Sequence, residues 1–267
     1  MELTQALAVL DDASEALDQT VSALPPRRWS RPTPARGWNI ATQIGHLVWS
    51  DEVSLRALRR DPELEQFLAR VAGSAVSGFV DRGARERAAL PVLHLLHEWR
   101  AGRRALARAV LEADPGGRVN LLGQQVLPRT LVAARIVETW AHALDVYDAL
   151  AMQAPSTAGV NVVARMGMRT REASFRARDI ELPVAAVRVD LAAAHGERLE
   201  FGPADAPESV AGDAWSFAAV VTQRRNVADV KLDVAGDGAA RWMRIAQAFG
   251  GVPTNGPAPG ARLEWHR

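Results

Sequence analysis

Three side chains in the stretch RIVETWAHALDVYDAL, residues 135–150, are spaced so that they could act together. Glu138 and His142 lie four residues apart, and Asp145 follows three residues later. In an α-helix such spacings place side chains on one side, so the carboxylate and the imidazole can reach the same point in space. Both groups are ligands that divalent metal ions take in proteins. The stretch therefore predicts part of a metal site, with a second carboxylate beside it.

A metal site needs at least one ligand more than this helix supplies. The chain has six histidines and no cysteine, so the further ligand must be an imidazole or a carboxylate. His46 lies in the apolar run IGHLVWSDE, where its side chain could face the same interior. Two imidazoles and one carboxylate suit Zn²⁺ with an open fourth position, or Fe²⁺, Ni²⁺ or Mn²⁺ with more open positions. The alternative interpretation is an ordinary buried histidine and a solvated Glu–His pair.

The other histidines and two nearby acids are expected to have different roles. His94 and His97 lie three residues apart in LHLLHEW, among neighbours typical of a core stripe, so we expect them to be structural. Exposure to solvent is expected for the two remaining histidines and for the two acids that follow His46 by five and six residues: His195, His266, Asp51 and Glu52.

The composition excludes several classes of protein. Lys and Arg number 32 and Asp and Glu 31, so a net charge of +1 gives no electrostatic reason to bind nucleic acid or an anionic membrane. The absence of cysteine excludes disulfides, thiolate metal sites and a cysteine nucleophile. No apolar run approaches the roughly 20 residues that cross a bilayer. The N-terminal MELTQALAVLDDASEAL is acidic where a signal peptide would be basic, so we expect a cytoplasmic protein.

Apolar periodicity predicts that the first part of the chain is helical. The predicted helices cover residues 3–24, 40–60, 62–80, 91–113 and 129–152. Asn39 is the expected N-cap of the second of these, and NLLGQQVLP before the last is expected to be a loop. Long helices joined by loops are typical of a helical bundle.

The second part of the chain mixes strands and helices. We expect a helix over 160–178, strands in AAVRVDL, RLEFG and VKLDVAG, and helices in DAWSFAAVVTQ and GAARWMRIAQAFGG. Such an alternation is typical of a small α+β domain. The predicted organisation is a metal-binding helical bundle over 1–153, a linking helix over 154–180 and the α+β domain over 181–267.

Four stretches carry a resemblance that covers most of the chain: TPARGWNIATQIGHLVWSDE, ARIVETWAHALDVYDAL, VAGDAWSFAAVVTQRR and GAARWMRIAQAFGG. The chain resembles the mycothiol-dependent maleylpyruvate isomerase family within the DinB-like metal-binding superfamily. Its closer likeness is to an actinobacterial-type subfamily of uncharacterised metal-binding proteins. The resemblance implies a DinB-like four-helix bundle with a small α+β domain behind it, and one divalent metal, usually zinc, held by His46, Glu138 and His142.

The resemblance also implies a chemistry. In the family, mycothiol or a related small thiol binds the metal as a thiolate and adds to a small electrophilic substrate, which gives isomerisation or thiol transfer. Asp145 would lie near the thiol, and Arg224 or Arg225 from the C-terminal domain would reach the active site. A capped carboxylate and a surface ion pair are the alternative roles for these residues.

Other functions remain open beside this one. A non-catalytic metal- or ligand-binding module would need the same ligands, and a metal-bound hydroxide would make the protein a hydrolase. The arginines of 165–178 scatter around their helix, so a role in tRNA modification ranks last and we expect no nucleic-acid or membrane partner. A small-molecule substrate and a monomer or homodimer are expected. Leu121, Leu122 and Asp179 depart from the family's pattern, which bears on the substrate more than on the metal.

Overall fold

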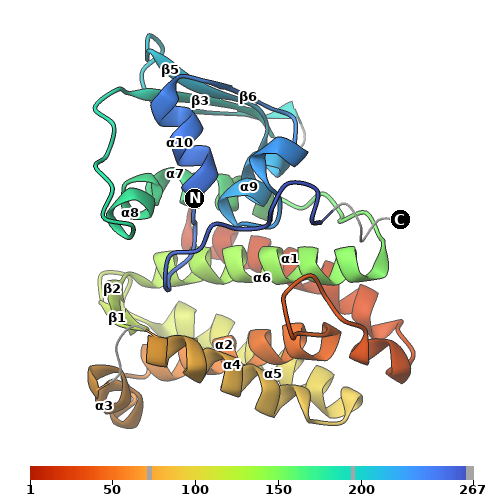
Figure 1. Ribbon diagram of the computed structural model, residues 1–267. Coiled ribbons are helices and arrows are strands. Elements are labelled where there is room, and N and C mark those ends of the chain that lie inside the picture. The colour runs from red at the N-terminus through yellow and green to blue at the C-terminus, as the bar shows by residue number, and fades with distance from the viewer. Residues whose placement is uncertain (71–73, 194–195, 263–267) are drawn as a thin grey trace. The chain divides into compact units, whose positions relative to one another are not determined.

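The computed structural model describes the chain except residues 71–73, 194–195 and 263–267, and the chain divides into two compact units, Met1–Leu150 and Ala151–Arg267 (Figure 1). The first unit is a bundle of helices, and the second combines helices with a small mixed sheet. The predicted fold class, a helical bundle with a small α+β part, is therefore confirmed. None of the described helices has the length and apolar character that crossing a bilayer requires.

The first unit is built around one central helix. Its helices are α1 (Leu3–Ser22), α2 (Ile40–Leu58), α3 (Pro62–Arg70), α4 (Ser74–Ala88), α5 (Val92–Glu112) and α6 (Pro128–Leu150), with a short 3₁₀ helix, η1 (Pro26–Ser30), before α2. Helix α2 contacts α4, α5 and α6, and α1 contacts α5 and α6 (Figure 1). Ile40, Ile44 and Leu47 of α2 are fully buried, so apolar burial holds the central helix in place.

The N-terminal half of α2 is fixed by a cap and by a glycine. Asn39 caps the helix as predicted, because its side-chain oxygen accepts a hydrogen bond from the Thr42 amide at 2.9 Å. Gly45 permits close packing, since a Cβ there would lie 2.4 Å from the carbonyl oxygen of Ala84 in α4. The turn of α2 that carries His46 is therefore packed directly against α4.

Two segments of the first unit differ from the prediction. The single helix predicted over 62–80 is two helices, α3 and α4, and the residues between them lie outside the described part of the chain. The predicted loop NLLGQQVLP contains an antiparallel hairpin of β1 (Val119–Leu121) and β2 (Gln124–Val126). Its turn residues Leu122 and Gly123 have φ angles of 49° and 91°. A two-residue hairpin turn needs such left-handed residues, and the leucine at the first position conceals this turn in the sequence.

The second unit places helices against a sheet of four strands. It contains α7 (Gly159–Arg169), α8 (Arg171–Arg176), β3 (Val187–Ala192), β4 (Arg198–Phe201), β5 (Glu208–Asp213), α9 (Ala214–Val221), a 3₁₀ helix η3 (Val227–Asp229), β6 (Leu232–Ala235) and α10 (Asp237–Ile245). The strand order is β4–β3–β5–β6. Strand β3 is antiparallel to β4 and parallel to β5, and β6 is antiparallel to β5.

The sequence misses one strand of this unit and joins two of its helices. Strand β5 was not predicted, because Gly212 and its polar neighbours interrupt the alternation that marks a strand. The helix predicted over 160–178 is broken at Thr170 between α7 and α8. The Thr170 hydroxyl donates to the carbonyl oxygens of Met166 and Gly167 at 3.0 and 3.1 Å, a bond that bends helices.

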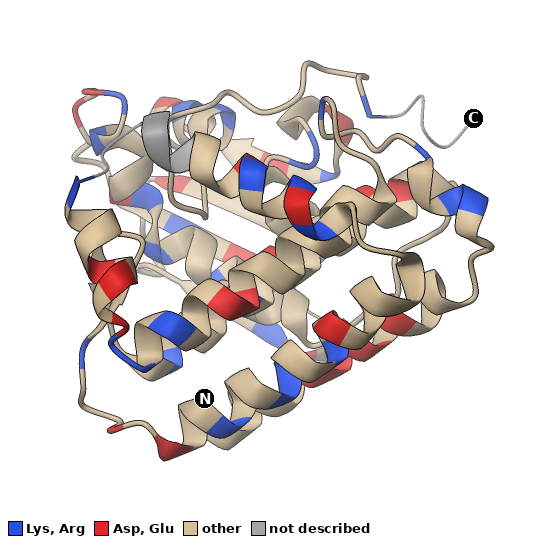
Figure 2. Cartoon of the chain, turned by 90° about the horizontal axis from the view of Figure 1, so that it is seen from below, with Lys and Arg blue, Asp and Glu red and all other residues tan. Residues whose placement is uncertain are grey.

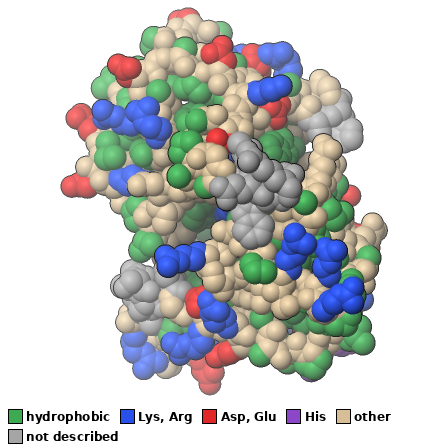
Figure 3. Space-filling view, turned by 45° about the vertical axis from the view of Figure 1, so that its right-hand side comes forward, with side chains coloured by type: hydrophobic (Ala, Val, Ile, Leu, Met, Phe, Trp, Pro, Cys, Tyr) green, Lys and Arg blue, Asp and Glu red, His purple; other side chains and the backbone are tan. Residues whose placement is uncertain are grey.

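Charged side chains of both signs are interspersed on the chain (Figure 2), and the face drawn in Figure 3 mixes hydrophobic, basic and acidic groups. Three arginines from the 165–178 segment make contacts within the second unit. Arg165 lies over the Phe201 ring, Arg176 pairs with Glu172, and Arg178 donates to the Ser174 carbonyl oxygen at 2.9 Å. Arg165 and Arg178 therefore contribute to packing, whereas the Arg176–Glu172 pair lies exposed on the surface.

A buried carboxylate ties α1 to α5. Asp18 is almost fully buried and accepts hydrogen bonds from Arg100 Nε at 2.8 Å, Arg103 Nη2 at 2.8 Å and Ser22 Oγ at 2.7 Å. Burial raises the pKa of Asp18, but the hydrogen bonds from Arg100 and Ser22 and the charges of the two arginines lower it by more. The pKa in the folded protein therefore lies below the ordinary value of 3.8.

We expect Asp18→Asn to lower the free energy of unfolding at pH 7 by about 2 kcal/mol, because it removes the buried carboxylate that accepts hydrogen bonds from two partly exposed arginines. A carboxyl whose pKa is depressed by folding stabilises the fold above its unfolded pKa, and this contribution is lost as pH falls through the folded pKa. The deficit of the variant should therefore shrink below the ordinary value of 3.8. Denaturant unfolding followed by circular dichroism at several pH values checks this, and a deficit that is constant with pH would contradict it.

Candidate metal centre

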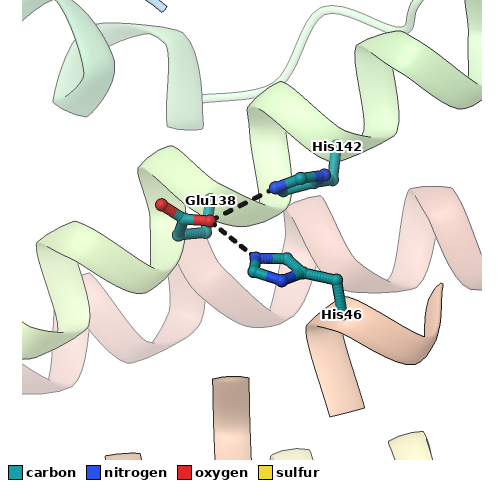
Figure 4. Close-up of side chains that lie close together, drawn as sticks. All are labelled: His46, Glu138 and His142. Atoms are coloured by element: carbon teal, nitrogen blue, oxygen red, sulfur yellow. Dashed lines mark hydrogen bonds and ion pairs between the residues drawn. The ribbon is translucent and has the colours of Figure 1, made fainter. Parts of the chain in front are cut away.

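The three residues predicted as metal ligands lie together in the first unit. His46 projects from α2, and Glu138 and His142 project from α6 one turn apart (Figure 4). Glu138 Oε2 lies 2.9 Å from His46 Nε2 and 3.3 Å from His142 Nε2. The two imidazole ring centroids are 4.3 Å apart. The candidate ligand atoms of the three side chains all lie within 4.8 Å of one another, close enough to bind a single ion.

Electrostatics keeps the carboxylate of this cluster ionised. Burial raises the pKa of Glu138, but hydrogen bonds and charge from His142 and His46 lower it by more, so the pKa lies well below its ordinary value. An ionised carboxylate facing two imidazole nitrogens is a donor set that Zn²⁺ and similar ions prefer. Among the described residues, the buried Nδ1 of His46 has no hydrogen-bond partner.

A buried ion pair fixes α2 against α6 close to the cluster. Arg135 Nε donates to Asp51 Oδ1 at 2.9 Å, and both side chains are 5% exposed or less. Asp51 was expected in solvent, and this prediction was wrong. Counting residues from His46 placed Asp51 on a different side of α2, but α6 covers that side as well, and Arg135 meets it there. The Arg135 guanidinium also donates to Ser50 Oγ at 2.6 Å, so the pair links the two helices that supply the ligands.

Two tryptophan rings flank the imidazoles. The Trp38 ring is stacked near His142, with centroids 5.8 Å apart, and lies 5.5 Å from the His46 ring. Its Nε1 donates to Asp81 Oδ1 on α4 at 2.8 Å, which fixes the orientation of the indole. The Trp49 ring also lies near, with its centroid 5.8 Å from that of the His46 ring. These rings make the surroundings of the cluster largely apolar on the sides that they cover.

Two residues beside the cluster were not identified from the sequence: Gln43, which contacts His142, and Thr33, which contacts Gln43. Gln43 Oε1 lies 2.5 Å from His142 Nδ1, and Gln43 Nε2 donates to Thr33 Oγ1 at 2.8 Å. Gln43 precedes His46 by three residues and is fully buried. The sequence offered one signal for Gln43: an amide side chain one helical turn from a candidate ligand, on an otherwise apolar face. Thr33 has no such signal, because it lies in a proline-rich loop that the fold brings back onto α2.

The other residues predicted for the site are Asp145, Arg224 and Arg225. Asp145 is fully buried in α6, and its Oδ2 lies 3.5 Å from Gln43 Nε2. Arg224 and Arg225 follow α9 in the second unit, where the Arg225 guanidinium lies 5.6 Å from the Trp215 ring centroid. Their approach to the cluster stays a prediction.

Of the four histidines outside the cluster, two are exposed on the first unit and two lie outside the described residues. His94 and His97 were expected in a core stripe, but both are exposed on α5, and His94 pairs with Glu98 at 3.3 Å. The apolar neighbours that suggested a core, Leu95 and Leu96, face inward while the histidines face outward. His195 and His266 lie outside the described residues.

The first unit is a helical bundle with a His–Glu–His cluster whose donor atoms could hold a metal ion. The chain matches the family model described as "Mycothiol maleylpyruvate isomerase N-terminal domain" over residues 10–147. It belongs to the mycothiol-dependent maleylpyruvate isomerase family. The matched residues include His46, Glu138 and His142.

Some known proteins are similar to this chain in sequence, and others are similar to it in fold. The chain is 38% identical over 250 residues to two uncharacterized proteins of Mycobacterium tuberculosis, Rv0036c of strain H37Rv and MT0041 of strain CDC 1551, covering 94% of this chain and 97% of each relative. Its fold is similar to a crystal structure of the mycothiol-dependent maleylpyruvate isomerase, with a TM-score of 0.59 and 14% identity over 84% of this chain and 90% of that one. A mutant of that enzyme matches equally well. At this identity the structural likeness establishes the fold alone.

We expect the buried Asp51–Arg135 pair to behave as a unit. Arg135→Met should lower the free energy of unfolding by about 3–5 kcal/mol, because it leaves a buried carboxylate without its partner. The double variant Asp51→Leu, Arg135→Met should recover most of that loss, since no uncompensated charge remains. Denaturant unfolding of the two variants and the wild type measures this coupling. A double variant as unstable as Arg135→Met would contradict it.

Proposed function

We propose that this chain binds one divalent metal ion, with zinc the first candidate, through His46, Glu138 and His142. We further propose that it uses a small thiol, mycothiol or a related compound, to transfer to or isomerise a small electrophilic substrate. The single observation that carries the proposal is the convergence of two imidazole nitrogens and an ionised carboxylate on one point in a chain of this family. A metal bound there supplies a Lewis acid that stabilises a coordinated thiolate.

The chain's own residues prepare this site in three ways. Glu138 supplies a negative charge that favours a cation, and its low pKa keeps that charge at neutral pH. Trp38 and Trp49 limit the polarity around the imidazoles, and electrostatic interactions strengthen where water is excluded. The chain has no cysteine, so a reactive thiolate must come from a small molecule.

The proposal also assigns roles beyond the metal ligands. Asp145, which is buried on α6, supports the site through its contact with Gln43. Arg224 or Arg225 orients an anionic group of the substrate, which is the role that a guanidinium fork serves well. A hydrolase that uses the metal with water, and a binding module without catalysis, are the alternatives that the experiments below separate from this function.

Protein purified without chelator should contain about one divalent metal ion per chain by mass spectrometry. His46→Ala and His142→Ala should each lose most of it, since two remaining ligands hold an ion poorly. The matched control is His94→Ala, His97→Ala, which removes two exposed histidines and should retain the metal. Absence of metal in the wild type after zinc is added back would contradict the proposal.

The thiol is tested with cobalt in place of zinc. Adding mycothiol to the cobalt-loaded protein should produce the near-ultraviolet absorption of a cobalt–thiolate bond, because a thiolate is a strong ligand for the open position. S-methylated mycothiol, which lacks the free thiol, is the matched control and should leave the spectrum unchanged. A metal-loaded protein whose spectrum does not respond to mycothiol would leave the binding module or the hydrolase as the function.

A further inference from the structure

We infer that Gln43 is a positioning residue that fixes the tautomer of His142. Its carbonyl oxygen accepts a hydrogen bond from His142 Nδ1–H, so that Nε2, which faces Glu138, is the ring nitrogen that would bind a metal. This inference deepens the proposed metal-binding function and rests on it. Four side chains of the first unit carry it: Gln43, His142, Thr33 and Asp145. The sequence predicts roles for His142 and Asp145 but none for Gln43 or Thr33.

The contact between Gln43 and His142 has two readings when taken alone. Gln43 Oε1 and His142 Nδ1 lie 2.5 Å apart. A neutral imidazole can donate or accept at Nδ1, and an amide can present either its oxygen or its nitrogen. The direction of this hydrogen bond therefore depends on what the other end of the Gln43 amide contacts.

Thr33 determines the orientation of the amide from one side. The Thr33 hydroxyl lies 3.2 Å from the carbonyl oxygen of Trp38, which can only accept, so the hydroxyl hydrogen is used there. Towards Gln43 the same hydroxyl therefore presents a lone pair. Gln43 Nε2 lies 2.8 Å from it, as a donor should.

Asp145 supports the same orientation from a second side. Its Oδ2 accepts a long hydrogen bond from Gln43 Nε2, at 3.5 Å, and both side chains are fully buried. Thr33 and Asp145 thus place the amide nitrogen on their side and the amide oxygen towards His142.

With the amide oriented in this way, His142 Nδ1 must be the donor. The other ring nitrogen, Nε2, lies 3.3 Å from Glu138 Oε2, and in the metal-free protein it hydrogen-bonds to that carboxylate. A metal ion at the cluster would replace the proton on Nε2, while Nδ1 keeps its proton through Gln43. Metal-binding histidines commonly donate their other ring nitrogen to such a neighbour, which fixes both tautomer and ring orientation.

The two histidines of the cluster are therefore held differently. His46 has a buried Nδ1 with no hydrogen-bond partner in the described part of the chain, whereas His142 has Gln43. Gln43 is fully buried behind the imidazole, so it acts on the metal through His142. Hydrogen bonding with Gln43 preorganises His142 on α6, and ring contacts with Trp38 and Trp49 preorganise His46 on α2.

The tautomer is measured directly by ¹⁵N NMR of the metal-free wild-type protein, with the His142 signals assigned from the spectrum of His142→Ala. We expect His142 Nδ1 to carry a proton, because the Gln43 carbonyl oxygen accepts a hydrogen bond from it. An unprotonated Nδ1 would overturn the inference. This readout needs no metal, so it decides the inference even if the proposed metal binding fails.

Metal affinity provides the second test. Gln43→Met keeps the side-chain volume and removes the acceptor, and should weaken zinc binding about 10- to 100-fold while His142 loses its single tautomer. Ser54→Ala is the matched control, because Ser54 is also buried on α2 but bonds only its own helix, at Ser50. Equal zinc affinity of Gln43→Met and the wild type, with both folded, would overturn the inference.

Discussion

The carboxylate of Glu138 lies between two imidazole nitrogens inside a helical bundle, and the rest of the first unit is arranged so that this polar cluster can exist there. Buried polar groups are destabilising without partners, and here the two imidazoles are largely buried while 30% of the Glu138 side chain is exposed. Glu138 finds its partners in His46 and His142, and the contact lowers its pKa well below the ordinary value. The same mutual attraction defines the point at which a divalent cation would complete the charge balance.

Placing this cluster requires α2 and α6 to meet in one register. Gly45 lets α4 pack against the turn of α2 that carries His46, and the Asp51–Arg135 pair joins α2 to α6 nearby. The loop before α2 is folded back so that Thr33 and Trp38 reach the cluster, with the Thr33 amide bonded to the Trp38 carbonyl at 2.9 Å. Helix packing, a buried ion pair and a structured loop therefore all help to fix the positions of His46, Glu138 and His142.

The sequence predicts this site as far as local periodicity reaches. Glu138 and His142 share a helix, so their spacing alone brings them together, and His46 follows from the need for a further ligand in a chain without cysteine. Contacts between distant segments are not encoded in spacing. Asp51 was assigned to solvent because its partner Arg135 lies on another helix, and Thr33 was overlooked because only the folded loop brings it to Gln43. Strand β5 and the turn at Leu122 were missed because tertiary pairing overrides a weak local signal there.

The central claim is that His46, Glu138 and His142 hold one divalent metal ion. It is tested most directly by anomalous diffraction from crystals of the zinc-loaded protein, recorded on both sides of the zinc absorption edge. The account predicts one strong anomalous peak among the three side chains, at about 2.0–2.2 Å from an imidazole nitrogen of each histidine and a carboxylate oxygen of Glu138. Fully occupied zinc at the exposed His94 and His97, with none at the cluster, would contradict it.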